Sequence, residues 1–317
     1  MDNLCRPLVT GGAGFVGSHL ITKLSELKEV EKIYCVDLPN ARRLDVLRLL
    51  PKVEVIETDL SRDDSINVLP DDATAVFALA AWNGTSNFYS NPFKVLLNSS
   101  SPTINTLKKY SGVAPIVYSS SSEVYANTIT TLNAPIPTSE EVITSIGDSK
   151  NPRWSYAMGK LFGEIALSAA CNEMNATGVI LRYHNLYGPD MGLDHFVSEF
   201  VNRVQNDDLS IQGGTSTRSF LYISEAVEAT IKALEYVKET PEIFNIGSVE
   251  ELSVLEASRI ILNKMGVDPK RIRSTTEPMG SVHRRCPDIN KIERVFGWKP
   301  GISFEQGIDL YLASLSN

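Results

Sequence analysis

Tyr156 and Lys160 are the pair of residues whose types and spacing first indicate chemistry. Because they are four positions apart, they lie on one face of any helix that contains them. A lysine ammonium beside a phenol favours the phenolate, and a phenol tuned in this way can exchange a proton with an alcohol. The hydroxyl of Ser121 could hold the oxygen of the same alcohol. The spacing alone is a common coincidence, and an exposed surface pair would produce the same pattern.

A glycine-rich stretch near the start of the chain gives this pair a context. Gly12, Gly14 and Gly17 fit the pattern G-x-G-x-x-G, and Gly11, Gly14 and Gly17 fit a G-x-x-G-x-x-G variant. Glycine permits a tight turn and lets backbone amides approach a pyrophosphate, which a helix N-terminus then stabilises. The motif by itself is weak, because a glycine-rich turn can also bind nothing.

The residues on either side of the glycines predict a strand followed by a helix. Leu4–Val9 is a short, mostly apolar run, and apolar residues that include Phe15 and Val16 recur after the glycines at helical spacing. A strand, a glycine turn and a helix in this order favour a dinucleotide site over a turn without a ligand.

An acidic residue follows the second apolar run, Lys32–Val36. Asp37 lies twenty residues after Gly17, where a carboxylate can accept hydrogen bonds from an adenosine ribose. It would repel a 2′-phosphate and so favours NAD over NADP, whereas Arg42 and Arg43 argue in the other direction. The alternative is an aspartate that only ends the strand in a turn.

Short apolar runs alternate with helical segments along the next part of the chain. The runs cover 53–57, 73–81, 114–119 and 175–184, and helical periodicity covers 91–109 and 155–172. This alternation predicts an α/β fold with a Rossmann-type doubly wound parallel sheet, in which ligands bind beyond the carboxyl ends of the strands. Asp59, Leu60, Ala78 and Ala80 lie at such ends.

The regular alternation loosens after Pro189. We expect a first, NAD-binding domain over residues 1–185, with a return of the chain to it at 224–248. Residues 186–223 and 249–317 would then form a smaller α/β lobe that binds the substrate.

The composition excludes several classes of protein. Of 317 residues, 43% are hydrophobic and 21% are charged, which is typical of a soluble globular protein. The net charge of −8 disfavours a nucleic-acid partner, and no apolar run reaches the roughly 18 residues of a membrane helix. The four cysteines have no metal-ligand spacing, and no signal peptide precedes the first strand. We therefore expect reduced thiols, no metal site and a cytoplasmic location.

Taken together, these motifs resemble the extended short-chain dehydrogenase/reductase family, which comprises NAD-dependent nucleotide-sugar epimerases, dehydratases and decarboxylases. The resemblance runs over essentially the whole chain, and it is specific for the family but not for the member. It rests on residues 10–17, 37, 59–60, 119–125, 156–160, 182–189, 285–288 and 296–300.

The resemblance implies roles for individual residues. Tyr156 would be the catalytic base, Lys160 its partner and Ser121 the catalytic hydroxyl. Asn185 and Arg218 would bind the diphosphate of the substrate, the guanidinium as a planar fork. NAD would be held by Gly11, Gly14, Phe15, Val16, Gly17, Asp37, Asp59, Leu60, Ala78, Ala80, Tyr156 and Lys160.

The resemblance also implies the reaction and the assembly. The shared step of the family is oxidation of a sugar at C4, which gives a 4-keto intermediate. The ketone acidifies the neighbouring C–H bonds and so allows epimerisation, elimination or loss of a carboxylate. A homodimer is implied too, formed by the helices around 92–110 and 155–172.

Three stretches depart from the usual pattern of the family. Arg218-Ser219 stands where the family usually has Arg-Asp. Pro278–Ser281 stands where an Arg-Pro-Gly-Asp stretch often supplies a second phosphate-binding arginine, a role that Arg284 or Arg285 could take. Trp82–Pro92 also differs from the usual sequence after the fourth strand, so we expect an unusual substrate.

Glu123 is the residue that separates the possible reactions. Simple C4 epimerases tend to have a small or hydroxyl residue there, whereas 4,6-dehydratases and glucuronate decarboxylases resemble this chain. Ser122 stands where a dehydratase has an aspartate. The pair Ser122-Glu123, together with a later arginine, resembles the decarboxylases, and Arg285 is the candidate for that arginine. Glu123 is therefore a catalytic candidate, and Ser121, Ser122 and Arg285 are substrate-binding candidates. The alternative is that Glu123 only bonds to backbone or to a neighbouring loop.

The favoured hypothesis is an NAD-dependent enzyme that modifies a nucleotide-diphosphate sugar through a C4 ketone, with a nucleotide-sugar epimerase as the first expectation. A decarboxylase, a 4,6-dehydratase and a C4 dehydrogenase stay open because of Glu123. A non-catalytic NAD(H)-binding protein is the alternative from another class, and the intact Ser121, Tyr156 and Lys160 argue against it.

Overall fold

The chain divides into two compact units in a computed structural model that describes residues 2–275 and 282–316. The first unit comprises the chain up to residue 124 together with 146–182 and 227–244. The second comprises 125–145, 183–226 and the chain from 245 onward. Segment 125–145, which the sequence pattern assigned to the first domain, thus belongs to the second unit. Among the described residues, no helix is both long and apolar enough to cross a membrane.

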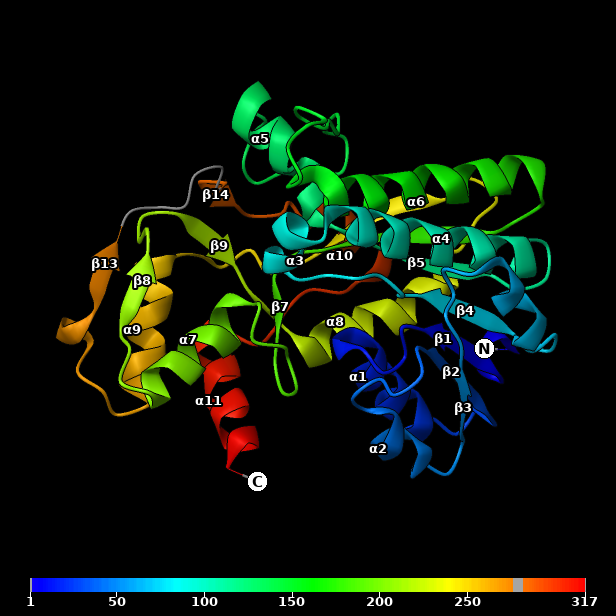
Figure 1. The fold of residues 1–317 in the computed structure, drawn as a ribbon, viewed down its shortest axis with the longest axis horizontal. Helices are drawn as coiled ribbons and strands as arrows, with labels where there is room; N and C mark the ends of the chain where they lie inside the picture. The colour runs from blue at the N-terminus through cyan, green and yellow to red at the C-terminus, as the bar shows by residue number, and fades with distance from the viewer. Residues whose placement is uncertain (1, 276–281, 317) are drawn as a thin grey trace. The chain divides into compact units, whose positions relative to one another are not determined.

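Among the described residues, the largest sheet has seven strands (Figure 1). In spatial order its strands are β11 (Glu242–Ile246), β6 (Gly178–Tyr183), β5 (Ile116–Ser121), β4 (Ala75–Ala78), β1 (Pro7–Thr10), β2 (Ile33–Asp37) and β3 (Val53–Glu57). The pairs β1–β2, β1–β4, β2–β3 and β4–β5 are parallel. The chain order therefore reverses between β1 and β4, which is the switch point of a doubly wound sheet. The predicted fold class is confirmed.

The buried strands explain why the sequence showed apolar runs rather than alternation. Every residue of β1 and of β4 is buried, since helices cover both faces of a parallel sheet. β1, β4 and β6 are shorter than the runs that predicted them, whereas β3 coincides with its run. Asp2–Leu4, for example, forms a 3₁₀ turn, η1, before β1 begins at Pro7.

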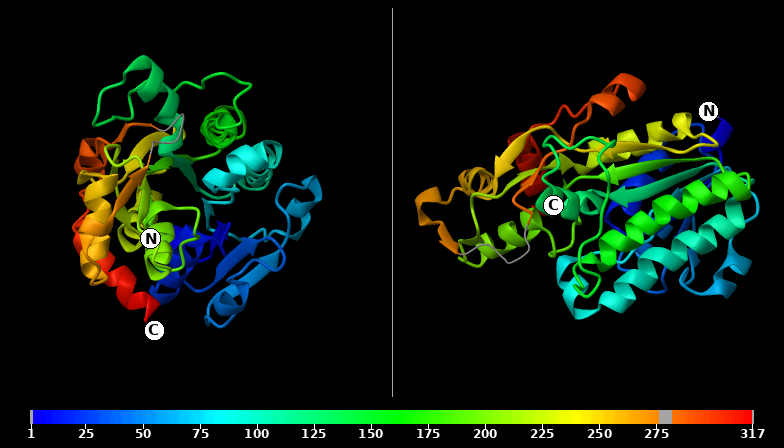
Figure 2. Two further views of the ribbon diagram at one scale, coloured as in Figure 1. Left: turned by 60° about the vertical axis from the view of Figure 1, so that its left-hand side comes forward. Right: turned by 90° about the horizontal axis from the view of Figure 1, so that it is seen from above.

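The helices of the first unit position its functional residues. They are α1 (Phe15–Glu26), α2 (Leu44–Arg48), α3 (Thr85–Ser90), α4 (Pro92–Tyr110), α6 (Trp154–Glu173) and most of α8 (Ile223–Lys232), with the 3₁₀ turns η2 (Asp63–Val68), η3 (Ser122–Tyr125) and η4 (Ala233–Tyr236). α4 and α6 are the longest of them, and they lie side by side (Figures 1 and 2). α6 also packs on β5, which brings the start of α6 to the end of that strand.

The second unit has short strands and five helices among its described residues. Its strands are β7 (Leu186–Tyr187), β8 (Ser210–Gln212), β9 (Thr217–Ser219), β10 (Leu221–Tyr222), β12 (Glu251–Ser253), β13 (Arg273–Thr275) and β14 (Arg284–Arg285). Its helices are α5 (Ala126–Leu132), α7 (Phe196–Gln205), α9 (Val254–Lys264), α10 (Asn290–Phe296) and α11 (Phe304–Leu315), with the 3₁₀ turn η5 (Pro269–Arg271). An aromatic cluster of Tyr187, Phe220 and Phe304 packs in its core.

Candidate active site

The glycine-rich loop forms a cradle made of backbone at the N-terminus of α1. Gly11 has a φ of +68°, and a Cβ there would lie 2.9 Å from the backbone of Ala80. A Cβ on Gly17 would lie 2.2 Å from the carbonyl oxygen of Gly11. Gly14 caps α1, so the N–H groups of the first turn, which includes Phe15 and Val16, have no acceptor within the helix. Such a loop offers an anion several N–H groups and no side chain.

Asp37 lies at the end of β2, next to this cradle. Its carboxylate accepts hydrogen bonds from the backbone N–H of Ala13 at 2.8 Å and of Leu38 at 2.7 Å. Burial raises the pKa of the carboxyl group above its ordinary value, and the backbone hydrogen bonds oppose that rise. A carboxylate can accept about four hydrogen bonds, so Asp37 retains capacity for ribose hydroxyls. The cradle and the acid together fit a dinucleotide such as NAD.

The other cofactor-binding candidates line the ends of neighbouring strands. Asp59 accepts bonds from the N–H and hydroxyl of Ser61, and Leu60 beside it is buried. Ala78 ends β4, and the Ser119 hydroxyl donates to its carbonyl oxygen at 3.1 Å. That a flat cofactor ring approaches the backbone beside these small side chains stays a prediction.

Tyr156 lies in the first turn of α6, beside the end of β5. Its side chain is buried. Burial raises the pKa of Tyr156, the charge of Glu123 raises it further, and the Ser121 hydroxyl opposes both. The ring of Phe88, on α3, stacks on the Tyr156 ring with 5.2 Å between centroids and 11° between planes. Sequence reasoning missed Phe88, because helical spacing within α3 does not reveal which ring it faces.

Lys160 lies one turn further along α6 and is 2% exposed. Its Nζ donates to the carbonyl oxygen of Ser119 at 2.7 Å and to the Ser119 hydroxyl at 3.2 Å. Burial lowers the pKa of Lys160 to about 7, while the charge of Glu164 acts in the opposite direction. The ammonium lies 5.9 Å from the centre of the Tyr156 ring. The predicted pair is therefore on one helix face and out of bulk solvent.

Glu164, one helical turn after Lys160, forms a buried ion pair with Arg182. Glu164 accepts two bonds from the guanidinium of Arg182, at 2.8 and 2.6 Å, and a third from the Ser120 hydroxyl. Both charged side chains are at most 6% exposed. Glu164 was not among the predicted residues, although its position four residues after Lys160 is a signal that could have found it.

Glu123 pairs with an arginine that the sequence analysis did not single out. Nη2 of Arg153 lies 3.3 Å from Oε2 of Glu123, and the side chains are 10% and 17% exposed. The backbone N–H of Glu123 donates to the Ser121 hydroxyl at 3.2 Å, and Ser122 beside it is buried. Arg153 precedes Tyr156 by three residues, and this spacing was the available signal. The first unit thus brings together Ser121, Glu123, Tyr156 and Lys160.

The predicted diphosphate-binding residues come together within the second unit. Arg218 on β9 and Arg285 on β14 are register partners in neighbouring parallel strands. The side-chain amide of Asn185 donates to the carbonyl oxygen of Ser219, the residue after Arg218, at 2.9 Å. Arg284 is engaged elsewhere, because it makes two bonds to the Glu251 carboxylate at 2.9 and 2.7 Å. The predicted departure at Pro278–Ser281 lies outside the described residues.

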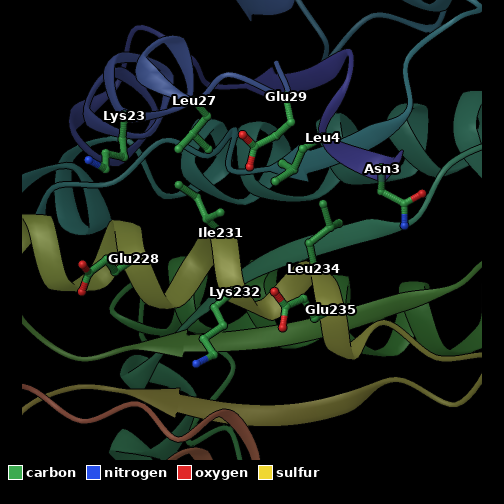
Figure 3. A pocket seen from close by; sticks show the side chains of 10 residues that line it. All are labelled: Asn3, Leu4, Lys23, Leu27, Glu29, Glu228, Ile231, Lys232, Leu234 and Glu235. Atoms are coloured by element: carbon green, nitrogen blue, oxygen red, sulfur yellow. The ribbon is translucent and has the colours of Figure 1, made fainter. Parts of the chain in front are cut away.

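A cavity of about 620 Å³ opens at a different place in the first unit (Figure 3). Leu4 and Leu27 line one wall, from the turn before β1 and the end of α1, and Ile231 and Leu234 line the other. Charged side chains such as Glu228 surround it. Its lining includes no residue of the predicted site, so we assign it no part in the chemistry.

Comparison with known proteins agrees with this geometry. A sequence model of the NAD dependent epimerase/dehydratase family matches residues 7–247. A UDP-N-acetyl-alpha-D-glucosaminuronate decarboxylase from Bacillus cytotoxicus is 32% identical, over 96% of this chain and 95% of its own. UDP-glucuronic acid decarboxylase 6 from Arabidopsis thaliana is 30% identical, over 96% and 87%. A crystal structure of a UDP-glucose 4-epimerase from Thermotoga maritima, with UDP-glucose, is 25% identical, with a TM-score of 0.84 over 98% of both chains.

The family match covers well over half of the chain, and its cofactor is the one that the glycine cradle and Asp37 fit. The resemblance drawn from the sequence is confirmed at the level of the family. The chain belongs to the NAD-dependent epimerase/dehydratase family and is an NAD-dependent enzyme of the extended short-chain dehydrogenase/reductase type.

Proposed function

We propose that the protein is an NAD-dependent decarboxylase of a UDP-linked uronic acid. The observation that carries this proposal is the Glu123 carboxylate, which sits beside Tyr156 and is paired with Arg153. An epimerase that only exchanges a hydride and a proton at C4 has no need of a second acid–base group there. The similarity to two uronate decarboxylases supports the same conclusion.

The first unit supplies the groups for the redox step. Tyr156, with Ser121 holding the same oxygen, accepts the proton of the C4 hydroxyl. NAD, when bound, supplies the hydride acceptor for this alcohol oxidation and the hydride donor for its reversal. Lys160 assists the phenol through its positive charge when it is protonated. The burial of Tyr156 and Lys160 keeps bulk water from the proton-transfer pair.

A ketone at C4 of a uronic acid makes the sugar a β-keto acid. The bond between C5 and the carboxylate carbon then breaks, carbon dioxide leaves, and the electron pair forms an enolate on C4 oxygen. C5 must then gain a proton. C5 is bonded to C4, the carbon whose hydroxyl Tyr156 deprotonates. A group that delivers this proton must therefore lie near Tyr156, and Glu123 is our candidate for it.

We further propose that Asn185, Arg218 and Arg285 bind the diphosphate. The two arginines are register partners on neighbouring strands, and guanidinium groups suit phosphate oxygens. On this proposal the first unit is the NAD-binding domain and the second unit binds the substrate.

The decisive experiment is incubation of the protein with UDP-glucuronate and with UDP-N-acetylglucosaminuronate, followed by mass spectrometry of the products. We expect loss of one carbon dioxide. Loss of water would indicate a dehydratase, and accumulated NADH with an oxidised product would indicate a C4 dehydrogenase. The control is Tyr156→Phe, which should reduce turnover by a factor of about 10² or more while NAD stays bound. Normal turnover by this variant would disprove the assignment of the base.

Epimerisation at C4 is the second candidate function. It is favoured by the similarity to the 4-epimerase structure and needs only Ser121, Tyr156 and Lys160. A product with unchanged mass and inverted C4 from UDP-glucose or from either uronate, without carbon dioxide, would establish it over the decarboxylase.

We also propose that the protein is a homodimer in which α4 and α6 pack against the same helices of a second copy. The outward faces of these helices carry exposed apolar side chains, notably Phe93 at 76% and Ile165 at 60%. Exposed apolar side chains on two neighbouring helices favour self-association.

A further inference from the structure

Arg153 is the residue directly before α6, and it forms an ion pair with Glu123 in η3. Its guanidinium contacts the Glu123 carboxylate at 3.3 Å and lies 5.4 Å from the centre of the Trp154 ring. Its backbone N–H donates to the Asn151 side chain at 3.0 Å, which holds the start of the helix. Nine-tenths of the Arg153 side chain is buried, so this contact is made in a site with little water.

The pair sits next to the phenol on which the proposed reaction depends. Glu123 acts electrostatically on Tyr156, and its backbone N–H donates to the hydroxyl of Ser121, which lowers the pKa of the same phenol. A half-buried carboxylate without a counter-ion would resist formation of a phenolate beside it, since two anions would then share the site. A guanidinium at hydrogen-bond distance opposes this repulsion.

The surroundings of Tyr156 contain few other charges. Among the described residues, the charge that acts on it is that of Glu123 from η3, while Tyr118 from β5 and Lys160 from α6 are the other titratable groups close to it. Arg153 reaches Tyr156 through its pairing with Glu123. The residues that α3 and α4 pack against it, Phe88 and Val95, carry no charge. Glu123 and Arg153 therefore form a balanced pair, and loss of either member changes the net charge beside the phenol.

We propose that Arg153 is a positioning residue, whose guanidinium fixes the Glu123 carboxylate beside the Tyr156 phenol and balances the charge of that carboxylate. Arg153 acts through Glu123 and touches neither the cofactor nor the sugar in this scheme. The role of Glu123 in proton transfer rests on the proposed function, but the charge balance at Tyr156 does not. The two can therefore fail separately.

The charge balance is tested without substrate, by following phenolate absorbance in the near ultraviolet as the pH rises. Each protein is compared with its own Tyr156→Phe version, so that the difference reports Tyr156 alone. Arg153→Met should move phenolate formation up by about one pH unit, and Glu123→Gln should move it down. The double variant, which lacks both charges, should return close to the wild type. Arg153→Lys should also stay close to it, because the charge remains.

Activity separates a positioning role from direct contact with the substrate. With UDP-glucuronate and carbon dioxide release as the readout, Arg153→Met should lower kcat about tenfold with little change in KM. In a Glu123→Gln background the same substitution should not lower kcat any further, because the carboxylate through which Arg153 acts is already absent. Arg203→Met, which removes an arginine paired with Glu199 on α7, is the matched control and should leave kcat unchanged.

Each failure has a distinct signature. If the wild type epimerises the sugar without releasing carbon dioxide, the proposed function is wrong, and the phenolate titration still decides the role of Arg153. If Arg153→Met leaves the titration unchanged, or if the double variant does not return toward the wild type, the positioning role is wrong. A rise in KM that persists in the Glu123→Gln background would overturn it too, in favour of direct binding of the substrate carboxylate.

Discussion

Lys160 is the residue at which burial and charge conflict most clearly. The helix face that holds the proton-transfer residues is almost free of solvent, so a lysine there loses the hydration that stabilises its ammonium. Two acceptors from Ser119 and the charge of Glu164 replace only part of that stabilisation. The pKa of Lys160 therefore falls to about 7, in the range where a small change in surroundings alters its protonation.

The protein should accordingly become more stable, relative to Lys160→Met, as the pH rises. The pKa of Lys160 is about 7 in the folded state and 10.5 in its ordinary state. Between these values the unfolded chain binds more protons than the folded one, so the free energy of unfolding rises with pH. The wild type should gain several kcal/mol over Lys160→Met between about pH 7 and about pH 10, since each pKa unit corresponds to about 1.4 kcal/mol. Below pH 7 the difference should be constant.

Urea unfolding at a series of pH values measures this difference. Lys264→Met is the matched control, because Asp309 and Glu305 raise the pKa of Lys264 in the folded protein, so that it is charged over most of this range, as an ordinary lysine is in the unfolded chain. A difference between wild type and Lys160→Met that does not vary with pH would contradict a depressed pKa at Lys160.

At the scale of elements, α6 organises the site in the first unit. Arg153, Tyr156, Lys160 and Glu164 follow one another at intervals of three or four residues and so share a face. That face can reach the end of β5 only if the helix approaches the strand closely. Gly163 permits this approach, since a Cβ at that position would lie 2.0 Å from the hydroxyl oxygen of Tyr118.

Replacing Gly163 with alanine should therefore disturb the site through the packing of α6. The new methyl group would collide with Tyr118, whose side chain is fully buried and whose hydroxyl donates to the carbonyl oxygen of Lys160. We expect a loss of about 1–3 kcal/mol in unfolding free energy, although alanine is the better helix former. Turnover should fall too, because Tyr156 and Lys160 would move with the helix. Gly192→Ala is the control, since nothing lies within 4 Å of a Cβ there. Equal stability of the two variants would show that α6 has room to move.

At the scale of the whole molecule, the sequence predicts best what local patterns determine. The apolar runs predict the sheet because strands buried on both faces need apolar side chains at nearly every position, as in β1. The spacing of Tyr156 and Lys160 predicts their shared face because it follows from the helix repeat.

What the sequence did not predict depends on contacts between distant segments. Arg153 meets Glu123 across thirty positions, and Phe88 meets Tyr156 across an even longer stretch of chain. Segment 125–145 joins the second unit through contacts of the same kind. Asn245 belongs to the second unit and accepts a bond from Tyr125, and such pairings have no periodicity to reveal them.

The outward faces of α4 and α6 lead to the last prediction, which concerns assembly. Phe93 and Leu97 on α4, and Ile165 on α6, are at least 40% exposed although they are apolar. Packing these faces against a symmetry-related copy would remove them from water, which supplies the driving force for a dimer. Sedimentation velocity at about micromolar concentration should therefore show a dimer for the wild type and a monomer for Phe93→Glu/Ile165→Glu.

Ile143→Glu tests whether any new charge on an exposed apolar residue has the same effect. Ile143 is 79% exposed, but it lies in segment 125–145 of the second unit and on neither of the two helices. The substitution should leave the dimer intact. A wild type that sediments only as a monomer would refute the dimer, and a dimer that survives the double substitution would place its interface on another surface. Because no residue of the proposed site is changed, the monomeric variant should also retain bound NAD.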